Sequence, residues 1–200
     1  QRYQVARPSA VVSPTAMNVF YIGVANPVAI SAPGIPKESL RVSMSGGGSI
    51  SGSNGSYTVK VTSPGNTKVN VAAEINGKVQ TIGSQEFRVK RIPDPVPQFA
   101  GKSGGTMSSV QIKSQNTVFA KLLNFDFDAR FTVTRFSLVI QKPRGDAIIL
   151  PPSTSGNLTP AMRTAMNTVT PGTRVYFEGI EAVGPDGSKR DIGSIALTAN

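Results

Sequence analysis

The run Ile92–Pro97 divides the sequence into two halves that both have the pattern of β-strands. Its three prolines fall within five residues, and each one lacks a backbone donor and fixes φ at about −65°. The residue before each proline is pushed toward an extended conformation. We therefore expect neither a helix nor a central strand here, but a short, semi-rigid linker over residues 93–98. Its hinge residues are Pro93, Asp94, Pro95 and Pro97.

A division at this linker gives residues 1–92 and 99–200, each close to the roughly 100 residues of a β-sandwich domain. The chain holds no Cys and no His. Disulfides and thiolate chemistry are therefore excluded, together with the commonest general base and the commonest transition-metal ligand. A sequence that starts at Gln1 and has no run of about 18 apolar residues is expected to be a fragment without a membrane span of its own.

Positive charge is concentrated in the first half. Residues 1–92 hold ten Lys and Arg against three Glu, a net charge of +7, and residues 93–200 hold eleven against eight, a net charge of +3. Such a surface keeps a protein soluble and also speeds its encounter with anionic partners. The aromatic residues follow the apolar phase of the strands, which argues against a nucleic-acid platform. The basic residues of the first half that could share a face are Lys37, Arg41, Lys60, Lys68, Lys78, Arg88, Lys90 and Arg91.

The first half reads as short strands after a leading arm over residues 1–14. Met17–Ile22 is an apolar strand candidate, and Asn26-Pro27 is expected to turn the chain. The strongest hairpin lies at residues 68–82. There Asn76-Gly77 follows an alternating strand directly, and this dipeptide tolerates the positive φ angles of a type I′ turn.

The second half is expected to open with a strand over Val110–Lys113, and Phe125–Asp128 also alternates like a strand. A phase slip near Thr134-Arg135 predicts a β-bulge in a long strand. Residues 160–169 predict one short helix, with Thr159 as its N-cap. A turn at Gly184–Gly187 separates the last strands. The fold class is mainly β, with two tandem antiparallel Ig-like β-sandwich domains, the second of which has one short α-helix.

The sequence offers little for catalysis or cofactor binding. Asp126 and Asp128 share a strand face without the oxygen density of a Ca²⁺ loop, and Glu178 and Glu181 would point to opposite faces. Gly101-Lys102-Ser103 resembles the end of a phosphate-binding loop, but it lacks the required upstream Gly and a following helix. The flexible Gly46–Gly48 turn lacks dinucleotide-binding spacing. We expect no catalytic residue, no metal site and no cofactor.

Several separated segments of the chain are similar to the GldM/PorM family, with the closer likeness to PorM, and the resemblance covers almost the whole chain. The segments that carry it are Val12–Gly34, Phe87–Pro95, Val175–Ile180 and Gly184–Gly187. They resemble the last two periplasmic domains of such proteins, which belong to the type IX secretion and gliding-motility machinery of Bacteroidetes.

This resemblance implies a periplasmic fragment of an inner-membrane-anchored protein, and a structural role that couples a proton-driven motor to an outer-membrane-associated ring. It implies a homodimer, a GldL/PorL-type partner contacted through the missing N-terminal part, and ring proteins of the GldK/PorK and GldN/PorN type. No enzyme activity, nucleic-acid binding or direct membrane contact by this fragment is expected. The alternative is an adhesin-like binding module that uses the loops at residues 46–55 and 151–157.

Overall fold

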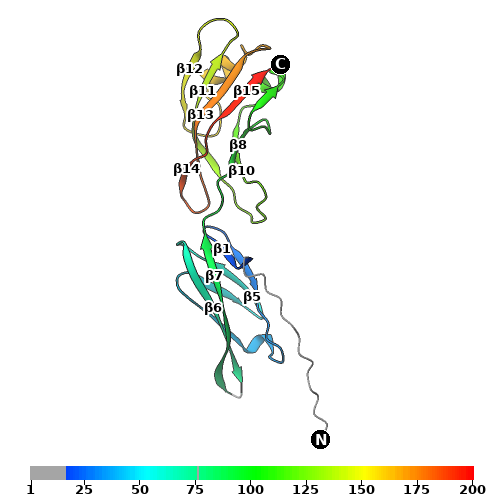
Figure 1. Ribbon diagram of the computed structural model, residues 1–200, viewed down its shortest axis with the longest axis vertical. Coiled ribbons are helices and arrows are strands. Elements are labelled where there is room, and N and C mark those ends of the chain that lie inside the picture. The colour runs from blue at the N-terminus through cyan, green and yellow to red at the C-terminus, as the bar shows by residue number, and fades with distance from the viewer. Residues whose placement is uncertain (1–16, 76) are drawn as a thin grey trace. The chain divides into compact units, whose positions relative to one another are not determined.

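The computed structural model describes residues 17–75 and 77–200, so the leading arm expected over residues 1–14 lies outside the described residues. The chain separates into two compact units, each built mainly from strands (Figure 1). Unit 1 contains residues 17–22 and 26–90 of the described chain, and unit 2 contains residues 23–25 and 91–200. The described residues contain no helix that is long and apolar enough to cross a membrane.

Unit 1 is a two-sheet sandwich of Ig-like type, with seven strands among its described residues. One sheet has the order β1 (Val19–Tyr21), β7 (Lys78–Lys90), β6 (Gly65–Ile75) and β3 (Leu40–Ser45), and the other has the order β2 (Asn26–Ala29), β5 (Ser56–Lys60) and β4 (Ser49–Ser53). A short 3-10 turn, η2 (Lys37–Ser39), leads into β3. The buried core between the sheets consists of Phe20, Ile22, Val59, Val61, Val69 and Val89.

The turn that was expected at Asn26-Pro27 is not found, because both residues belong to strand β2. Asn26 is the first residue of β2 and is only 2% exposed. Its side-chain Oδ1 accepts from the backbone N–H of Tyr21 at 2.8 Å, while its Nδ2 donates to the Tyr21 carbonyl at 2.9 Å and to the Val59 carbonyl at 3.2 Å. Tyr21 lies in one sheet and Val59 in the other, so this one amide ties the two sheets together where local turn chemistry was expected.

The predicted hairpin is confirmed by β6 and β7, which pair from Gly65↔Val89 to Ile75↔Lys78, with Gly77 at φ +73°. Asn76 itself lies outside the described residues. The hairpin projects beyond the rest of unit 1 (Figure 1). A register shift follows Val71↔Gly83 and twists the projecting part.

Unit 2 is built on a six-stranded sheet with the order β12 (Ile148–Ser153), β11 (Thr132–Gln141), β13 (Arg174–Val183), β15 (Ile195–Ala199) and β9 (Gly105–Met107), with β14 (Lys189–Asp191) pairing to β13. A two-stranded sheet of β8 (Val96–Phe99) and β10 (Val118–Lys121) packs against it, and Phe99 and Phe177 have ring centroids 4.5 Å apart. Two short helices complete the unit within its described residues: α1 (Ser109–Ser114) and α2 (Pro160–Met166).

Three local predictions in unit 2 are confirmed. The helix α2 begins at Pro160, and its N-cap Thr159 accepts from the backbone N–H of Met162 at 3.2 Å. The register between β11 and β13 shifts on both sides of Arg135, which is the predicted bulge. The turn at Gly184–Gly187 closes with a bond from the Gly187 N–H to the Gly184 carbonyl at 3.0 Å. In each case the conformation depends on residues that are close together in the sequence.

Two strand predictions in unit 2 are wrong. Residues 110–113 belong to helix α1, because Ser108 caps it by accepting from Gln111 N at 3.3 Å, and Val110 is 74% exposed while Ile112 is buried. Residues 122–130, all described, lie in no strand. Asn124 takes a left-handed φ of +54° there, which an extended strand does not allow.

The sheets are antiparallel except for one parallel pair in each unit, as far as the described residues go. In unit 1, β1 runs parallel to β7 with Phe20 opposite Val89. In unit 2, β9 runs parallel to β15 with Thr106 opposite Thr198. In both units an early strand therefore lies beside the last strand and points the same way.

We predict that Asn26→Ala destabilises unit 1 by about 2 kcal/mol, because the substitution removes the hydrogen bonds of Asn26 to two partly buried backbone groups of Tyr21 and to the buried carbonyl of Val59. The urea midpoint of amide resonances from unit 1, followed in the intact chain, measures this change. The matched control is Asn66→Ala at an exposed position of β6, which should change stability by less than about 0.5 kcal/mol. Equal effects of the two substitutions would contradict the bridging role.

Candidate functional site

The linker prolines occupy three different environments. Pro93 and Asp94 are exposed, whereas Pro95 and Pro97 are buried. Pro97 lies inside β8, opposite Ala120 of β10. A proline is tolerated there because β8 belongs to a two-stranded sheet rather than to the middle of a large one. The segment between the end of β7 and the start of β8 is therefore residues 91–95.

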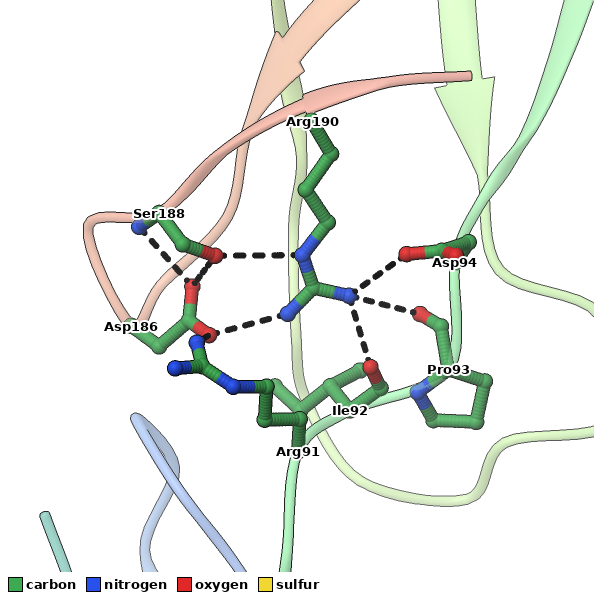
Figure 2. Close-up of polar contacts among 7 residues, drawn as sticks. All are labelled: Arg91, Ile92, Pro93, Asp94, Asp186, Ser188 and Arg190. Atoms are coloured by element: carbon green, nitrogen blue, oxygen red, sulfur yellow. Dashed lines mark hydrogen bonds and ion pairs between the residues drawn. The ribbon is translucent and has the colours of Figure 1, made fainter. Parts of the chain in front are cut away.

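Arg190 holds this segment from the side of β14 (Figure 2). Its Nη1 donates to the carbonyl of Ile92 at 2.7 Å and to Asp94 Oδ1 at 2.9 Å. The Pro93 carbonyl lies 3.5 Å from the same nitrogen, at the outer limit of a hydrogen bond. Pro93 and Pro95 have no N–H to offer a β-partner, so the linker has fewer donors than an ordinary strand and is fastened here through carbonyls and the Asp94 side chain. A guanidinium, which only donates, matches that set of acceptors.

The other side of the same guanidinium is fixed by the turn before β14. Nη2 donates to Asp186 Oδ2 at 2.9 Å, and Nε donates to Ser188 Oγ at 3.1 Å. Asp186 also accepts from the backbone N–H of Ser188 at 3.0 Å and from its hydroxyl at 2.7 Å. Arg91 Nη1 lies 3.6 Å from Asp186 Oδ2. We call this set of side chains, Arg190, Asp186, Ser188 and Asp94, the arginine cluster.

The Arg190–Asp186 ion pair at the centre of the arginine cluster is largely removed from water, whereas Asp94 is exposed. The Arg190 side chain is 12% exposed and that of Asp186 is 2% exposed. The Arg190 Cζ also lies 5.0 Å from the ring centroid of Phe131, within the range of a cation–π contact. Hydrogen bonds between ionised groups gain strength in such surroundings, and the planar guanidinium fixes direction as well as charge. This geometry restrains the backbone, and it leaves no free acid, base or nucleophile.

The protonation of Asp186 follows from the same contacts. Burial of the carboxylate raises its pKa, but hydrogen bonds from the side chain and backbone of Ser188 and from Arg190, together with the charge of Arg190, lower it by more. The net pKa of Asp186 lies below its ordinary value of 3.8. The folded state therefore keeps this carboxylate ionised well into the acid range.

Sequence reasoning identified the linker and the turn but not the residue that joins them. Arg190 lies 98 positions from Ile92 along the chain, and only the pairing of β14 with β13 brings the two together. A local signal was present in the spacing of Asp186 and Arg190, an i,i+4 ion pair. Nothing in the sequence identified the linker carbonyls as its second partner.

The remaining candidate residues from the sequence do not converge on a site. Asp128 and Arg130 form an ion pair of 3.7 Å with both side chains 90% exposed, and Glu181 pairs with Lys189 at 2.5 Å. Lys102 Nζ donates to the carbonyl of Thr106 at 2.6 Å within its own turn. The described part of the chain holds no group of three or more acidic side chains arranged to bind a metal ion.

The fold defines a class, that of tandem β-sandwich proteins. Two family models match the chain. The model of the GldM third domain matches residues 9–90, and the model of the GldM C-terminal domain matches residues 93–200. The chain therefore belongs to the GldM family. Its domains imply involvement in gliding motility and type IX secretion and fit a periplasmic location, and the GldM family is a structural motor component.

No curated protein matches the chain. Among solved structures, the D0-D1 domain of Intimin is 11% identical and has a TM-score of 0.24, with 92% of each chain covered. The protocadherin gammaB7 EC3-6 cis-dimer structure is 10% identical and has a TM-score of 0.22, with 88% of this chain and 51% of that chain covered.

We predict that Asp186→Asn lowers the stability of unit 2 at neutral pH and that this deficit shrinks in acid. A carboxylate with a depressed folded-state pKa stabilises fully above its unfolded-state pKa, and the stabilisation disappears as the pH falls through the lower folded-state pKa. Urea midpoints of unit 2 resonances in the intact chain, measured between pH 7 and pH 2, test this. Asp146→Asn in an exposed turn is the control. A deficit of constant size across the range would contradict the assignment.

Proposed function

We propose that this chain is the force-transmitting periplasmic part of the type IX secretion machinery, coupling an inner-membrane, proton-driven motor to an outer-membrane-associated ring. The observation that carries the proposal is that Arg190 fastens residues 92–94, the first residues of unit 2 after β7, to the rest of that unit. An arm that transmits movement needs joints that bend little, and the linker at this joint is held within unit 2 by charge-assisted hydrogen bonds from Arg190 in addition to its prolines.

The fastened linker shortens the segment in which the chain can flex. From Ile92 to Asp94 the backbone is held by the arginine cluster, and from Val96 it is paired in β8. Pro95, which is buried, lies between these two attachments. Of the expected hinge residues, Pro93, Asp94 and Pro95 are therefore proposed as a linker that is held and bends little, and Pro97 acts as part of the strand that follows.

The parallel pair β1–β7 of unit 1 supports the same function. When a chain is pulled from its ends, β1 is drawn backward and β7 forward. Because these strands are parallel, the force slides them along each other, so their hydrogen bonds must yield together. Bonds just outside the pair add to this resistance: Arg88 N donates to the Asn18 carbonyl at 2.9 Å, and Ile22 N donates to the Lys90 carbonyl at 3.0 Å.

Partners follow from this function as further proposals. The chain acts as a homodimer, meets ring proteins of the GldK/PorK and GldN/PorN type, and is connected to a GldL/PorL-type partner by the parent protein's membrane-anchored part. Residues 1–92 and 99–200 are proposed as the two mechanical modules, joined through residues 93–98. The larger positive charge of residues 1–92 would speed the encounter with an anionic partner surface.

Loosening the linker should impair secretion while both units stay folded. We predict this result for Arg190→Ala, which releases the linker carbonyls, and for Pro93→Gly, which softens an exposed position without removing buried surface. Secretion of a type IX substrate is measured in cells that carry each variant in the full-length protein, and amide spectra of the purified chain verify folding. Pro64→Gly, in an exposed loop of unit 1, is the matched control. Normal secretion by both folded linker variants would count against force transmission.

Unit 1 should resist force better across its parallel pair than across its hairpin. Single molecules are pulled between cysteines placed at positions 18 and 90, which slides β1 along β7, or between positions 63 and 90, which opens β6 and β7 one pair at a time. The chain has no native cysteine to interfere. We expect a higher unfolding force for the first pair of positions. Equal unfolding forces for the two pairs of positions would contradict a mechanical role for the parallel strands.

A further inference from the structure

The segment between β10 and β11 borders an open groove in unit 2. Residues 122–130 follow an irregular path there, and an isolated bridge between Ala120 and Phe131 closes the base of the segment. The groove has a volume of about 600 Å³, within the range of ligand-binding clefts. Its apolar walls are formed by Phe119, Leu122, Phe125, Phe127 and Phe131.

The aromatic residues of this groove differ from those of the core of unit 2. The rings of Phe99, Phe136 and Phe177 are fully buried. In contrast, Phe119 is 56% exposed, and Phe125 and Phe127 are half-buried with their ring centroids 5.3 Å apart. Large apolar side chains gathered at a concave surface are typical of sites that bind another molecule. Phenylalanine suits such a site because it offers a large contact area and has few rotamers to lose.

The polar lining of the groove is positively charged. Lys121 and Arg130 line it together with the amide of Gln98, and no carboxylate is found among its described lining residues. Asp126 and Asp128 alternate with the phenylalanines and are exposed. The 3.7 Å ion pair between Asp128 and Arg130 is solvated on both sides, so it binds Arg130 only weakly and leaves its charge available.

We propose that this groove binds an extended peptide segment of a partner protein in which a large apolar side chain is flanked by carboxylates. The phenylalanine walls would take the apolar side chain, and Lys121 and Arg130 would pair with the flanking carboxylates. Asp126 and Asp128 repel a uniformly anionic chain such as a nucleic acid, whereas single carboxylates can reach the two cations. The proposal concerns recognition by unit 2 and does not depend on force transmission through the linker.

The test is an NMR titration of the intact, isotope-labelled chain with two short synthetic peptides. One carries Phe and Leu two residues apart, flanked by Glu, and the other carries Lys at the Glu positions. We expect the acidic peptide to shift resonances of residues 119–131 and to bind at least five-fold more tightly than the basic peptide. Absence of binding at millimolar peptide, or equal affinity for the two peptides, would overturn the proposal.

Variants locate the site on the molecule. Phe119→Ser replaces an exposed side chain, so the fold should persist while affinity for the acidic peptide falls at least ten-fold. Lys121→Glu should reverse the preference toward the basic peptide. The matched control is Ile149→Ser on β12, which replaces a side chain that is 75% exposed and lies outside the groove, and it should leave affinity unchanged. An equal loss in Phe119→Ser and Ile149→Ser would contradict the assignment.

A second copy of this chain is the rival occupant, and sedimentation separates the two cases. If the unliganded chain self-associates and Phe119→Ser alone abolishes that association, the groove is an interface between copies and the peptide proposal is wrong. If Phe119→Ser leaves the association state unchanged while it weakens the acidic peptide, the proposal is supported.

Discussion

The guanidinium of Arg190 is the interaction on which the architecture of this linker depends. A chain of prolines can be stiff in itself but offers almost no donors by which a neighbouring domain could hold it. Arg190 supplies donors only, and it delivers them to the Ile92 carbonyl and to Asp94 while Asp186 and Ser188 hold it from behind. Without this group the linker would keep its local stiffness and lose the hydrogen bonds that hold Ile92 and Asp94.

A structural function explains the chemistry that the chain contains and the chemistry that it lacks. The sequence has no His and no Cys, and the pKa of its buried carboxylate Asp186 is lowered rather than tuned toward neutral pH. A group that stays ionised at every physiological pH makes a constant contact, which suits a joint better than a catalyst. In unit 1, the parallel pair β1–β7 is consistent with the proposed mechanical role, because a pull from the two ends slides these strands along each other.

Sequence patterns predicted what depends on neighbours along the chain. The alternating residues before Asn76-Gly77 predicted the hairpin, and the slip in alternation predicted the bulge at Arg135. Thr159, followed by Pro160, predicted the start of α2. These patterns failed where the conformation of a segment depends on a partner far away in the sequence or on a competing local hydrogen bond. Asn26 looked like a turn residue because its partner Val59 is 33 positions away.

Helix α1 was mistaken for a strand because Val110 and Ile112 alternate with polar residues, whereas in the helix they lie on opposite faces, with Val110 exposed and Ile112 buried, and Ser108 caps the helix. The role of Arg190 could not be predicted from local patterns, because its bond to Ile92 spans 98 positions of the sequence.

The central claim is that the linker backbone is immobilised on unit 2, and ¹⁵N relaxation of the linker amides tests it most directly. We predict order parameters for Arg91, Ile92, Asp94 and Val96 close to those of the paired strand β13, about 0.85. The same amides should become mobile when Arg190 is replaced by Ala. Order parameters below about 0.6 in the native chain, typical of a flexible segment, would contradict the account.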